Sequence, residues 1–280
     1  MSDVLNQSLS QQEYNIHPGD TLLDQVERVV CVLFPRGMIA AGFSDRGDML
    51  MIRYSDYKKE LPTWIIDFYE HQFLNEDLLA MPNKVIAVYI ATDKNLIVPD
   101  GIFNESEAAI WLSKIHHIET NELVSEFYLR DAIAHYLYAW PSGVQNLITR
   151  YFQSAVILPF ASYQFHKPYQ SRCLLQCCIT MNQVYATLYN EDELVWHQVF
   201  NYENAEDIAY HILLLCKEHN IDSNAMSFQC TITSRSLSFV LQQLNQFFPK
   251  MKDGSGNVDT TDKSWTGTIF LLQQLYACAL

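Results

Sequence analysis

Short apolar runs separated by turns dominate the first part of the chain, beginning near Val29. The segments between the runs are rich in Gly, Pro, Asp and Ser. This pattern predicts a three-stranded antiparallel meander. The predicted strands are Val30–Phe34, Met38–Phe43 and Met49–Tyr54. An amphipathic segment opened by Pro62 then predicts a helix, and Val85–Ile90 predicts a buried strand, which gives the order β-β-β-α-β.

The second half of the chain repeats this order. Its predicted strands are Cys173–Ile179, Val184–Tyr189, Leu194–Phe200 and Ser227–Thr233. Before the last of them a helix is predicted from about Asn204 to His219, because Asn204 and Asp207 have the spacing of a capping arrangement. From Val30 to Lys84, just before the fourth strand, is 54 residues in the first half, and from Cys173 to Met226 is 53 residues in the second. This agreement favours an internal duplication.

Further helices and strands are predicted between the repeats and after the second one. Asn104 and Glu107 are spaced as a capping pair, which predicts a helix from Asn104 through Ile118. The other predicted elements are a strand at Ile133–Ala139, a helix opened by Pro141, a strand at Ala155–Leu158 and a helix marked by Leu237, Val240, Leu241 and Leu244. Residues 252–263 predict a flexible loop. The apolar segment Ile269–Ala279 is expected to dock on the body.

These elements predict an N-terminal arm followed by two lobes. The arm covers residues 1–22 and is expected to add one short element to the body. The first lobe covers residues 23–165 and the second covers residues 166–280. The stretch Tyr163–Arg172 is the best linker candidate between them.

The order of elements resembles the duplicated actin-like ATPase architecture, also described as ribonuclease H-like. More narrowly, the chain resembles a bacterial domain-of-unknown-function family found in Bacteroidetes. The segments that carry this likeness are Val30–Tyr54, Ile97–Glu105 and the second meander from Cys173. The resemblance covers nearly the whole chain after residue 20 and implies an α/β fold of two β-β-β-α-β lobes with mixed sheets. Because that family has no established activity, it supplies no functional residues.

In actin-like ATPases and sugar kinases, the turn between the first two strands of each half brings an Asp and small residues to the nucleotide phosphates. Glycine lets backbone N–H groups reach a phosphate, and the carboxylate holds the metal. Here the corresponding turns are Phe34–Gly37 and Thr180–Gln183. Neither contains an acid, only one contains a glycine, and Pro35 lacks an amide hydrogen. We therefore expect degenerate phosphate loops, no cofactor and no catalytic or metal-binding residue.

Two functional hypotheses follow. The first is a non-catalytic actin-like scaffold or protein-interaction module whose partner is another protein or a second copy of the chain. The second is a divergent ATPase or small-molecule kinase that binds ATP with magnesium in the cleft between the lobes. The residues expected near the phosphates in that case are Arg36, Gly37, Asp93, Thr180, Asn182 and Ser234. Asp93 is also the position where a kinase of this superfamily would place a base, although a plain turn acid is the preferred interpretation.

Charge and hydropathy limit the partners. The chain has 32 acidic and 18 basic residues and a formal charge of −14, which repels nucleic acid and the anionic face of a membrane. No apolar run reaches the roughly 18 residues needed to cross a bilayer. The N-terminus lacks a secretory signal pattern. We therefore expect a soluble, cytoplasmic protein without nucleic acid or direct membrane insertion.

Several isolated motifs contain residue types that can bind metals. Asp67, Glu70 and His71 form D-x-x-E-H, which lacks the second imidazole of an inverted zinc-protease motif. The adjacent pair His116-His117 diverges by about 100° around a helix, so the two rings do not converge on one ion. The seven cysteines lie mostly in apolar patterns and are expected to be buried, reduced thiols.

Overall fold

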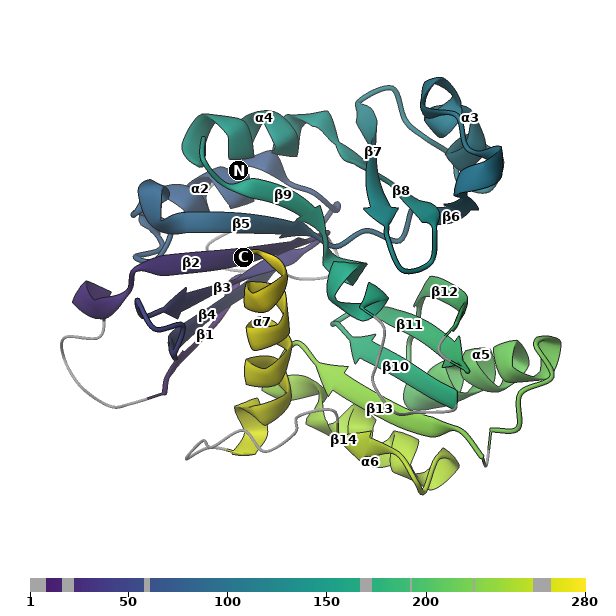
Figure 1. Ribbon diagram of the computed structural model, residues 1–280. Helices are drawn as coiled ribbons and strands as arrows, with labels where there is room; N and C mark the ends of the chain where they lie inside the picture. The colour runs from purple at the N-terminus through teal and green to yellow at the C-terminus, as the bar shows by residue number, and fades with distance from the viewer. Residues whose placement is uncertain are drawn as a thin grey trace.

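The computed structural model describes residues 9–16, 23–57, 61–166, 173–191, 193–223, 225–253 and 263–280. Within these residues the strands form two large sheets and one small one, with helices packed against them (Figure 1). The α/β class expected from the hydrophobic pattern is confirmed. None of the described helices combines the length and the apolar composition that a membrane crossing requires.

The first large sheet has the strand order β1-β4-β3-β2-β5-β9. Its strands are β1 (Leu9–Asn15), β2 (Arg28–Phe34), β3 (Gly37–Phe43), β4 (Met49–Tyr57), β5 (Val85–Ile90) and β9 (Val156–Pro159). Strands β2, β3 and β4 form the predicted antiparallel meander, and β1 from the N-terminal arm pairs antiparallel with β4. Strands β5 and β9 run parallel to β2. The sheet is therefore mixed.

The second large sheet has the order β12-β11-β10-β13-β14 and repeats this plan. Its strands are β10 (Cys173–Ile179), β11 (Gln183–Asn190), β12 (Glu193–Asn201), β13 (Ser227–Ile232) and β14 (Lys252–Asp253). Strand β10 lies between antiparallel β11 and parallel β13, as β2 lies between β3 and β5. The predicted β-β-β-α-β order is thus present twice. Strand β14 occupies the start of the predicted loop, whose residues 254–262 lie outside the described residues.

A small sheet of order β6-β8-β7 is inserted between β5 and β9. Its strands are β6 (Asn95–Pro99), β7 (Glu122–Leu129) and β8 (Ala134–Pro141). Strand β7 was not predicted, because the apolar pair at 123–124 and the apolar run at 127–129 do not alternate with polar residues. Helix α3 (Ala108–Ser113) packs on this sheet.

The prediction of a helix from Asn104 through Ile118 was too long. A 3-10 turn, η4 (Glu105–Glu107), precedes the six-residue α3. The Asn104 side chain accepts a hydrogen bond from the Ser106 N–H at 3.2 Å, so the cap belongs to the 3-10 turn. The Glu107 N–H donates to the Asn104 backbone carbonyl oxygen at 2.9 Å and not to the side chain. Ile115 lies beyond the end of α3 and is 62% exposed.

The remaining helices cover the two large sheets. They are α2 (Ile66–Asn75), α4 (Ser142–Tyr151), α5 (Ala205–Glu218), α6 (Ser238–Phe247) and α7 (Thr266–Cys278). Helices α2 and α4 pack on each other over the first sheet, and α5 and α6 lie on the second (Figure 1). The predicted cap of α5 is confirmed as a full capping box between Asn204 and Asp207. Short 3-10 turns complete the described chain at η1 (Leu23–Gln25), η2 (Pro82–Lys84), η3 (Asp100–Ile102), η5 (Phe160–Phe165), η6 (Arg235–Leu237) and η7 (Lys263–Trp265).

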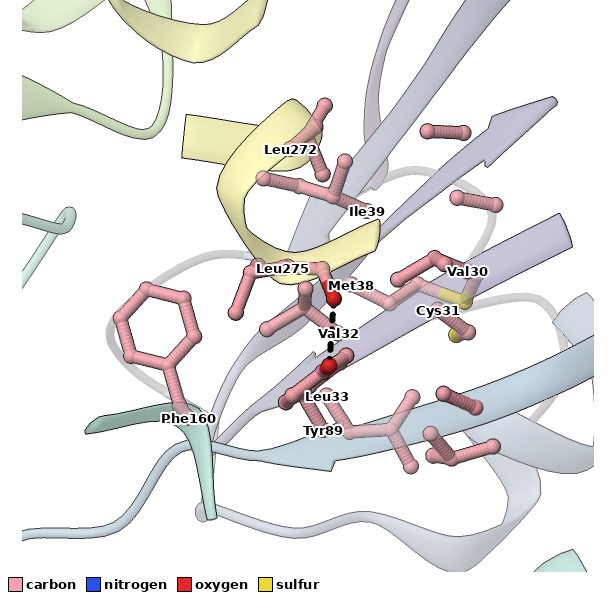
Figure 2. Close-up of a cluster of buried hydrophobic side chains, with 14 of the residues drawn as sticks. Val30, Cys31, Val32, Leu33, Met38, Ile39, Tyr89, Phe160, Leu272 and Leu275 are labelled. Atoms are coloured by element: carbon pink, nitrogen blue, oxygen red, sulfur yellow. Dashed lines mark hydrogen bonds between the residues drawn. The ribbon is translucent and has the colours of Figure 1, made fainter. Parts of the chain in front are cut away.

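Helix α7 lies between the two large sheets and contacts both β2 and β13 (Figure 1). Its buried side chains join the core around β2 and β5, where Leu272 and Leu275 pack beside Val32 and Phe160 (Figure 2). The Tyr89 hydroxyl donates a hydrogen bond to the Leu275 carbonyl oxygen at 2.5 Å. The last helix of the chain is therefore shared by both halves. The start of the predicted linker is η5, and its residues 167–172 lie outside the described residues.

Candidate functional site

The tip of the β2–β3 hairpin is anchored within its own lobe. Pro35 and Arg36 form the turn, and Pro35 has no amide hydrogen. The Pro35 carbonyl oxygen accepts hydrogen bonds from the Trp64 N–H at 2.6 Å and from the Tyr57 hydroxyl at 2.8 Å. The Arg36 carbonyl oxygen accepts from the Tyr57 N–H at 3.0 Å. The end of β4 and the segment before α2 therefore bond the backbone carbonyl oxygens of this tip.

Gly37 follows this turn, and its lack of a side chain is explained by strand packing. A Cβ at this position would lie 2.7 Å from the Ser55 carbonyl oxygen and 3.0 Å from the Cβ of Asp56. Both contacts come from β4, whose backbone is fixed by pairing with β3. The glycine is thus required by close approach of the neighbouring strand. An approaching phosphate is not needed to account for it.

The tip of the β10–β11 hairpin is closed by a threonine side chain. Thr180 Oγ1 accepts hydrogen bonds from the Gln183 N–H at 3.0 Å and the Asn182 N–H at 3.4 Å. The Thr180 N–H donates to the Gln183 carbonyl oxygen at 2.8 Å. The Thr180 carbonyl oxygen accepts from the Tyr202 hydroxyl at 2.6 Å. Backbone amides that could face a phosphate are therefore used inside the turn.

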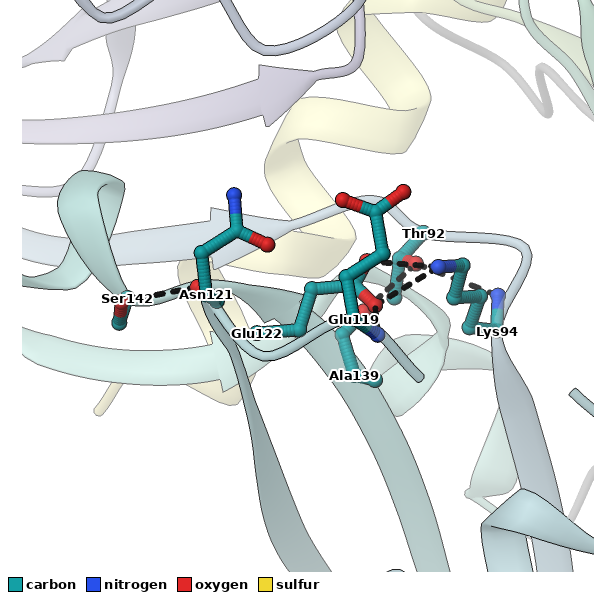
Figure 3. Close-up of polar contacts among 7 residues, drawn as sticks. All are labelled: Thr92, Lys94, Glu119, Asn121, Glu122, Ala139 and Ser142. Atoms are coloured by element: carbon teal, nitrogen blue, oxygen red, sulfur yellow. Dashed lines mark hydrogen bonds and ion pairs between the residues drawn. The ribbon is translucent and has the colours of Figure 1, made fainter. Parts of the chain in front are cut away.

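The segment after β5, which leads into the small sheet, contacts both β8 and β7 (Figure 3). The Thr92 hydroxyl donates to the Ala139 carbonyl oxygen at 2.8 Å. Lys94 Nζ lies 2.8 Å and 2.7 Å from the two carboxylate oxygens of Glu122. The Tyr185 hydroxyl, from the opposite lobe, donates to the Thr92 carbonyl oxygen at 3.3 Å. Side chains from both lobes and from the small sheet therefore meet at this point.

Two cavities flank the hairpin tips and contain five of the six residues predicted near the phosphates. Arg36, Asp93 and Asn182 line a cavity of about 1120 Å³. A smaller cavity of about 320 Å³ is lined by Arg36, Gly37, Thr180 and Asn182. Ser234 lines neither cavity, because its hydroxyl bonds Gln12 Oε1 at 3.3 Å and Ser236 Oγ at 2.9 Å within the protein.

The larger cavity carries more acid than base. Its carboxylates are Asp93, Glu119, Glu122, Glu203 and Asp207, and its Lys and Arg side chains are Arg36 and Lys94. Lys94 is neutralised by Glu122. Arg36 Nε is buried and, among the described residues, makes no hydrogen bond. A lining with this excess of carboxylates repels a triphosphate and favours a cationic or neutral ligand.

Burial perturbs the ionisable groups of the smaller cavity. Desolvation raises the pKa of Asp56, and the hydrogen bond from the Tyr54 hydroxyl, 3.3 Å away, only partly opposes this rise. Burial also raises the pKa of Tyr57, so its hydroxyl stays protonated and donates to Pro35. Sequence reasoning missed Asp56 and the Lys94–Glu122 pair, because both depend on partners brought together by the fold.

The described residues contain no group of three His, Cys, Asp or Glu side chains placed to hold a metal ion. Glu70 of the D-x-x-E-H motif is ion-paired with Arg150. His116 Nε2 lies 3.0 Å from the Asn95 carbonyl oxygen. All seven cysteines are free thiols. Glu70 and His116 thus each have a partner within the protein.

Comparison with known structures identifies the class of fold as that of the actin-like ATPases. A protein of Bacteroides thetaiotaomicron VPI-5482 with an actin-like ATPase fold and unknown function matches with a TM-score of 0.70 at 12% identity, over 84% of this chain and 93% of that chain. A chain of the PilM–PilN type IV pilus biogenesis complex matches with a TM-score of 0.54 at 10% identity, over 91% of this chain and 99% of that chain.

The sequence assigns the chain to a protein family. Residues 43–251 match the family described as "Protein of unknown function (DUF3822)", and the chain belongs to it. Among curated proteins, none matches the sequence significantly. The resemblance inferred from the meanders is confirmed, both for the unknown-function family and for the actin-like fold.

The fold class implies magnesium and ATP, and the residues at the tips do not fit that pair. Neither tip contains an acid, Pro35 has no amide hydrogen, and Thr180 Oγ1 occupies two amides of the second tip. A triphosphate grip needs several converging N–H groups and a carboxylate to hold the metal. We therefore derive no chemical step through a nucleotide.

Proposed function

We propose that the protein is a non-catalytic scaffold or protein-interaction module built on the actin-like fold, with degenerate phosphate loops. The observation that carries this proposal is the closed second tip, where the Thr180 hydroxyl accepts the amides of Asn182 and Gln183. Amides satisfied inside a turn are not free for a ligand, and breaking their bonds to bind one costs free energy. The acid-rich lining of the adjacent cleft adds repulsion of phosphate.

The proposed partner is another protein or a second copy of the chain, and the proposed compartment is the cytoplasm. The likeness to a chain of the PilM–PilN complex supports a role in protein assembly, because that complex pairs two proteins in type IV pilus biogenesis. The seven free cysteines agree with a reducing compartment. A formal charge of −14 argues against nucleic acid as the partner.

A second candidate is a divergent ATPase or small-molecule kinase. It is favoured by one observation, the gathering of Arg36, Asp93 and Asn182 on a single cavity of about 1120 Å³. Under this alternative, Arg36 would contact phosphate and Asp93 would act as a base.

Thermal unfolding with and without ATP, ADP and magnesium separates the two candidates. A ligand at about 100 times its dissociation constant stabilises the native state by about 2.7 kcal/mol, which raises the midpoint by several degrees. The scaffold proposal predicts an unchanged midpoint at millimolar nucleotide. A raised midpoint that Arg36→Ala and Asp93→Ala both abolish would instead support the nucleotide-binding candidate.

A further inference from the structure

Strand β7 is an unprotected edge of the small sheet. It is eight residues long, it pairs with β8 on one side, and the register of that pairing is uninterrupted. It contains no Pro, Gly or Lys, which are the residues that commonly blunt an edge strand. Other edges carry such features: β6 ends at Pro99, and the β11–β12 pairing has a register shift next to Tyr189.

The backbone groups on the free edge of β7 can be assigned. The Ala139 N–H of β8 donates to the Lys94 carbonyl oxygen, so Ala139 faces the β6 side. Val124 is the residue of β7 that pairs with Ala139, and it therefore directs its own N–H and C=O away from β8. Glu126 and Tyr128 lie two and four residues further along the strand and point the same way. Outside the strand ladders, these three residues make no backbone–backbone hydrogen bond in the described part of the chain. The edge thus offers a row of open donors and acceptors.

Acidic and imidazole side chains alternate across one face of the small sheet, and the last of them, Glu126, lies on β7. His135 of β8 lies between Asp100 and Glu126, with Nε2 2.9 Å from Asp100 Oδ1 and Nδ1 2.6 Å from Glu126 Oε1. The sequence of charges is therefore acid, imidazole, acid. The side chain of Glu126 is 30% exposed, so the next strand position beside it is open to a cation.

Apolar groups accompany these charges at the far end of the strand. Phe103 stacks on His135 with ring centroids 3.9 Å apart, and Tyr128 lies 5.1 Å from the same ring. Tyr128 is 46% exposed. Ile133, in the turn between β7 and β8, is 63% exposed and has φ of 48°, a left-handed conformation that is unfavourable for a β-branched residue. The turn therefore holds a large apolar side chain in solvent at a conformational cost.

We propose that β7 is a docking edge that adds a strand from a protein partner, and that this partner strand is extended, apolar and basic. The inference rests on the proposed function and specifies its interaction surface. Main-chain bonds to Val124, Glu126 and Tyr128 supply the affinity, and a Lys or Arg beside Glu126 continues the alternation of charge and supplies the specificity. An apolar partner residue covers Tyr128.

Charge favours a basic partner over a second copy of this chain. The stretch from Glu119 to Leu129 contains three glutamates and no basic residue. Pairing two β7 strands would bring four carboxylates, Glu122 and Glu126 of each copy, to one seam between molecules that each carry a formal charge of −14. Like charges on facing strands are destabilising, whereas a Lys beside Glu126 is favourable.

The test uses a defined probe, a capped ten-residue peptide of alternating Val and Thr that begins with Val and has Lys at its third and seventh positions, so that Val lies two positions from each Lys, on the face that meets Tyr128. Its affinity for the full chain is measured by fluorescence anisotropy, and amide hydrogen exchange of residues 122–129 is followed in the complex. A matched peptide with Glu in place of both Lys residues is the charge control. Val124→Pro removes an outward N–H without touching the β7–β8 ladder, and Val124→Thr keeps that N–H.

The proposal predicts saturable binding of the Lys peptide with slower exchange in residues 122–129. Val124→Pro should weaken binding by about tenfold or more while Val124→Thr stays within about twofold, since main-chain bonds supply most of the affinity. Glu126→Gln, which keeps a hydrogen-bonding group for His135, should weaken binding several-fold and reduce the preference for Lys over Glu peptide.

The absence of saturable binding at millimolar Lys peptide, or equal binding by Val124→Pro and wild type, would overturn the proposal. A dimer of the chain whose protection covers residues 122–129 and which Val124→Pro dissociates would also overturn it, because the occupant would then be a second copy. These outcomes are independent of the nucleotide experiment. If the Lys peptide does not bind, the scaffold proposal is unaffected. If nucleotide binds in the cleft, that result alone does not overturn the proposal that β7 is a docking edge.

Discussion

At the two hairpin tips, individual side chains decide what the backbone can offer a ligand. Pro35 removes an amide from the first tip, and the Thr180 hydroxyl accepts two amides of the second. Gly37, the residue that most resembles a phosphate-loop glycine, is explained by its contact with β4. The residues that would mark a nucleotide site from sequence thus have structural roles here.

Replacing Thr180 tests the hydroxyl directly. Thr180→Val keeps the shape of the side chain but leaves the Asn182 and Gln183 amides without their acceptor in a buried turn. We expect a loss of about 1–2 kcal/mol in the free energy of unfolding, measured by urea denaturation. Thr149→Val, which removes an exposed hydroxyl from α4, is the control and should change stability by less than about 0.5 kcal/mol. A Thr180→Val protein as stable as wild type would show that the turn does not depend on this hydroxyl.

Replacing Gly37 tests the packing explanation. In Gly37→Ala the new Cβ meets the Ser55 carbonyl oxygen at 2.7 Å, and that oxygen belongs to a paired strand that cannot easily move. We expect destabilisation of about 1–3 kcal/mol by chemical denaturation. Gly101→Ala is the matched control, because nothing lies within 4 Å of its added Cβ. Equal effects of the two substitutions would contradict the packing account.

At the scale of elements, hydrophobic periodicity and capping predicted most of the large sheets and their helices. The α5 cap was found because Asn204 and Asp207 interact locally, three residues apart. The small sheet was mostly missed, because β7 does not alternate and the Asn104 cap serves a 3-10 turn. The cleft was predicted only in part, since Lys94 and Glu122 are distant in sequence and meet through β-sheet pairing.

The small sheet should have a pH-dependent stability that depends on His135. Burial lowers the pKa of this imidazole, but its hydrogen bonds to Asp100 and Glu126 raise it more, so the pKa lies above the ordinary value of 6.5. A raised folded-state pKa stabilises the protein at pH values below the unfolded-state pKa, and this stabilisation is lost as pH rises through the folded-state pKa.

His135→Gln should therefore destabilise the protein most near about pH 5.5 and progressively less as the pH rises above about 7. Urea denaturation of both proteins across this range measures the difference. His116→Gln provides a control histidine that contacts a backbone carbonyl oxygen and no carboxylate among the described hydrogen bonds. A His135→Gln effect that is constant with pH would mean that the imidazole is not charged between its two acids.

For the whole molecule, α7 determines how the halves behave together. The helix is the last element of the described chain. Its side chains belong to the core around β2 and β5, and it also contacts β13. Two lobes that share one buried helix should unfold as a single cooperative unit. The division at residues 165 and 166 stays a prediction, and α7, which it places in the second lobe, contributes buried side chains to the core around β2 and β5.

Shortening a buried side chain of the shared helix tests this coupling. Leu272 is fully buried, and Leu272→Ala should cost about 2–5 kcal/mol of unfolding free energy. Because the helix contacts both sheets, fluorescence and far-UV circular dichroism should report one coincident transition at a lower denaturant midpoint. Leu280→Ala, at a position 75% exposed, is the control and should be near neutral. Two separated transitions in wild type would contradict the shared core.

The most direct measurement of the central claim is equilibrium dialysis of the intact chain against labelled ATP with magnesium. The missing amide hydrogen of Pro35, the closed second tip and the acid-rich cleft predict no saturable binding at nucleotide concentrations up to about 1 mM. A dissociation constant of that size corresponds to about −4.1 kcal/mol. Stoichiometric, magnesium-dependent binding with a dissociation constant in the micromolar range would contradict the account, because the two tips would then be gripping a triphosphate.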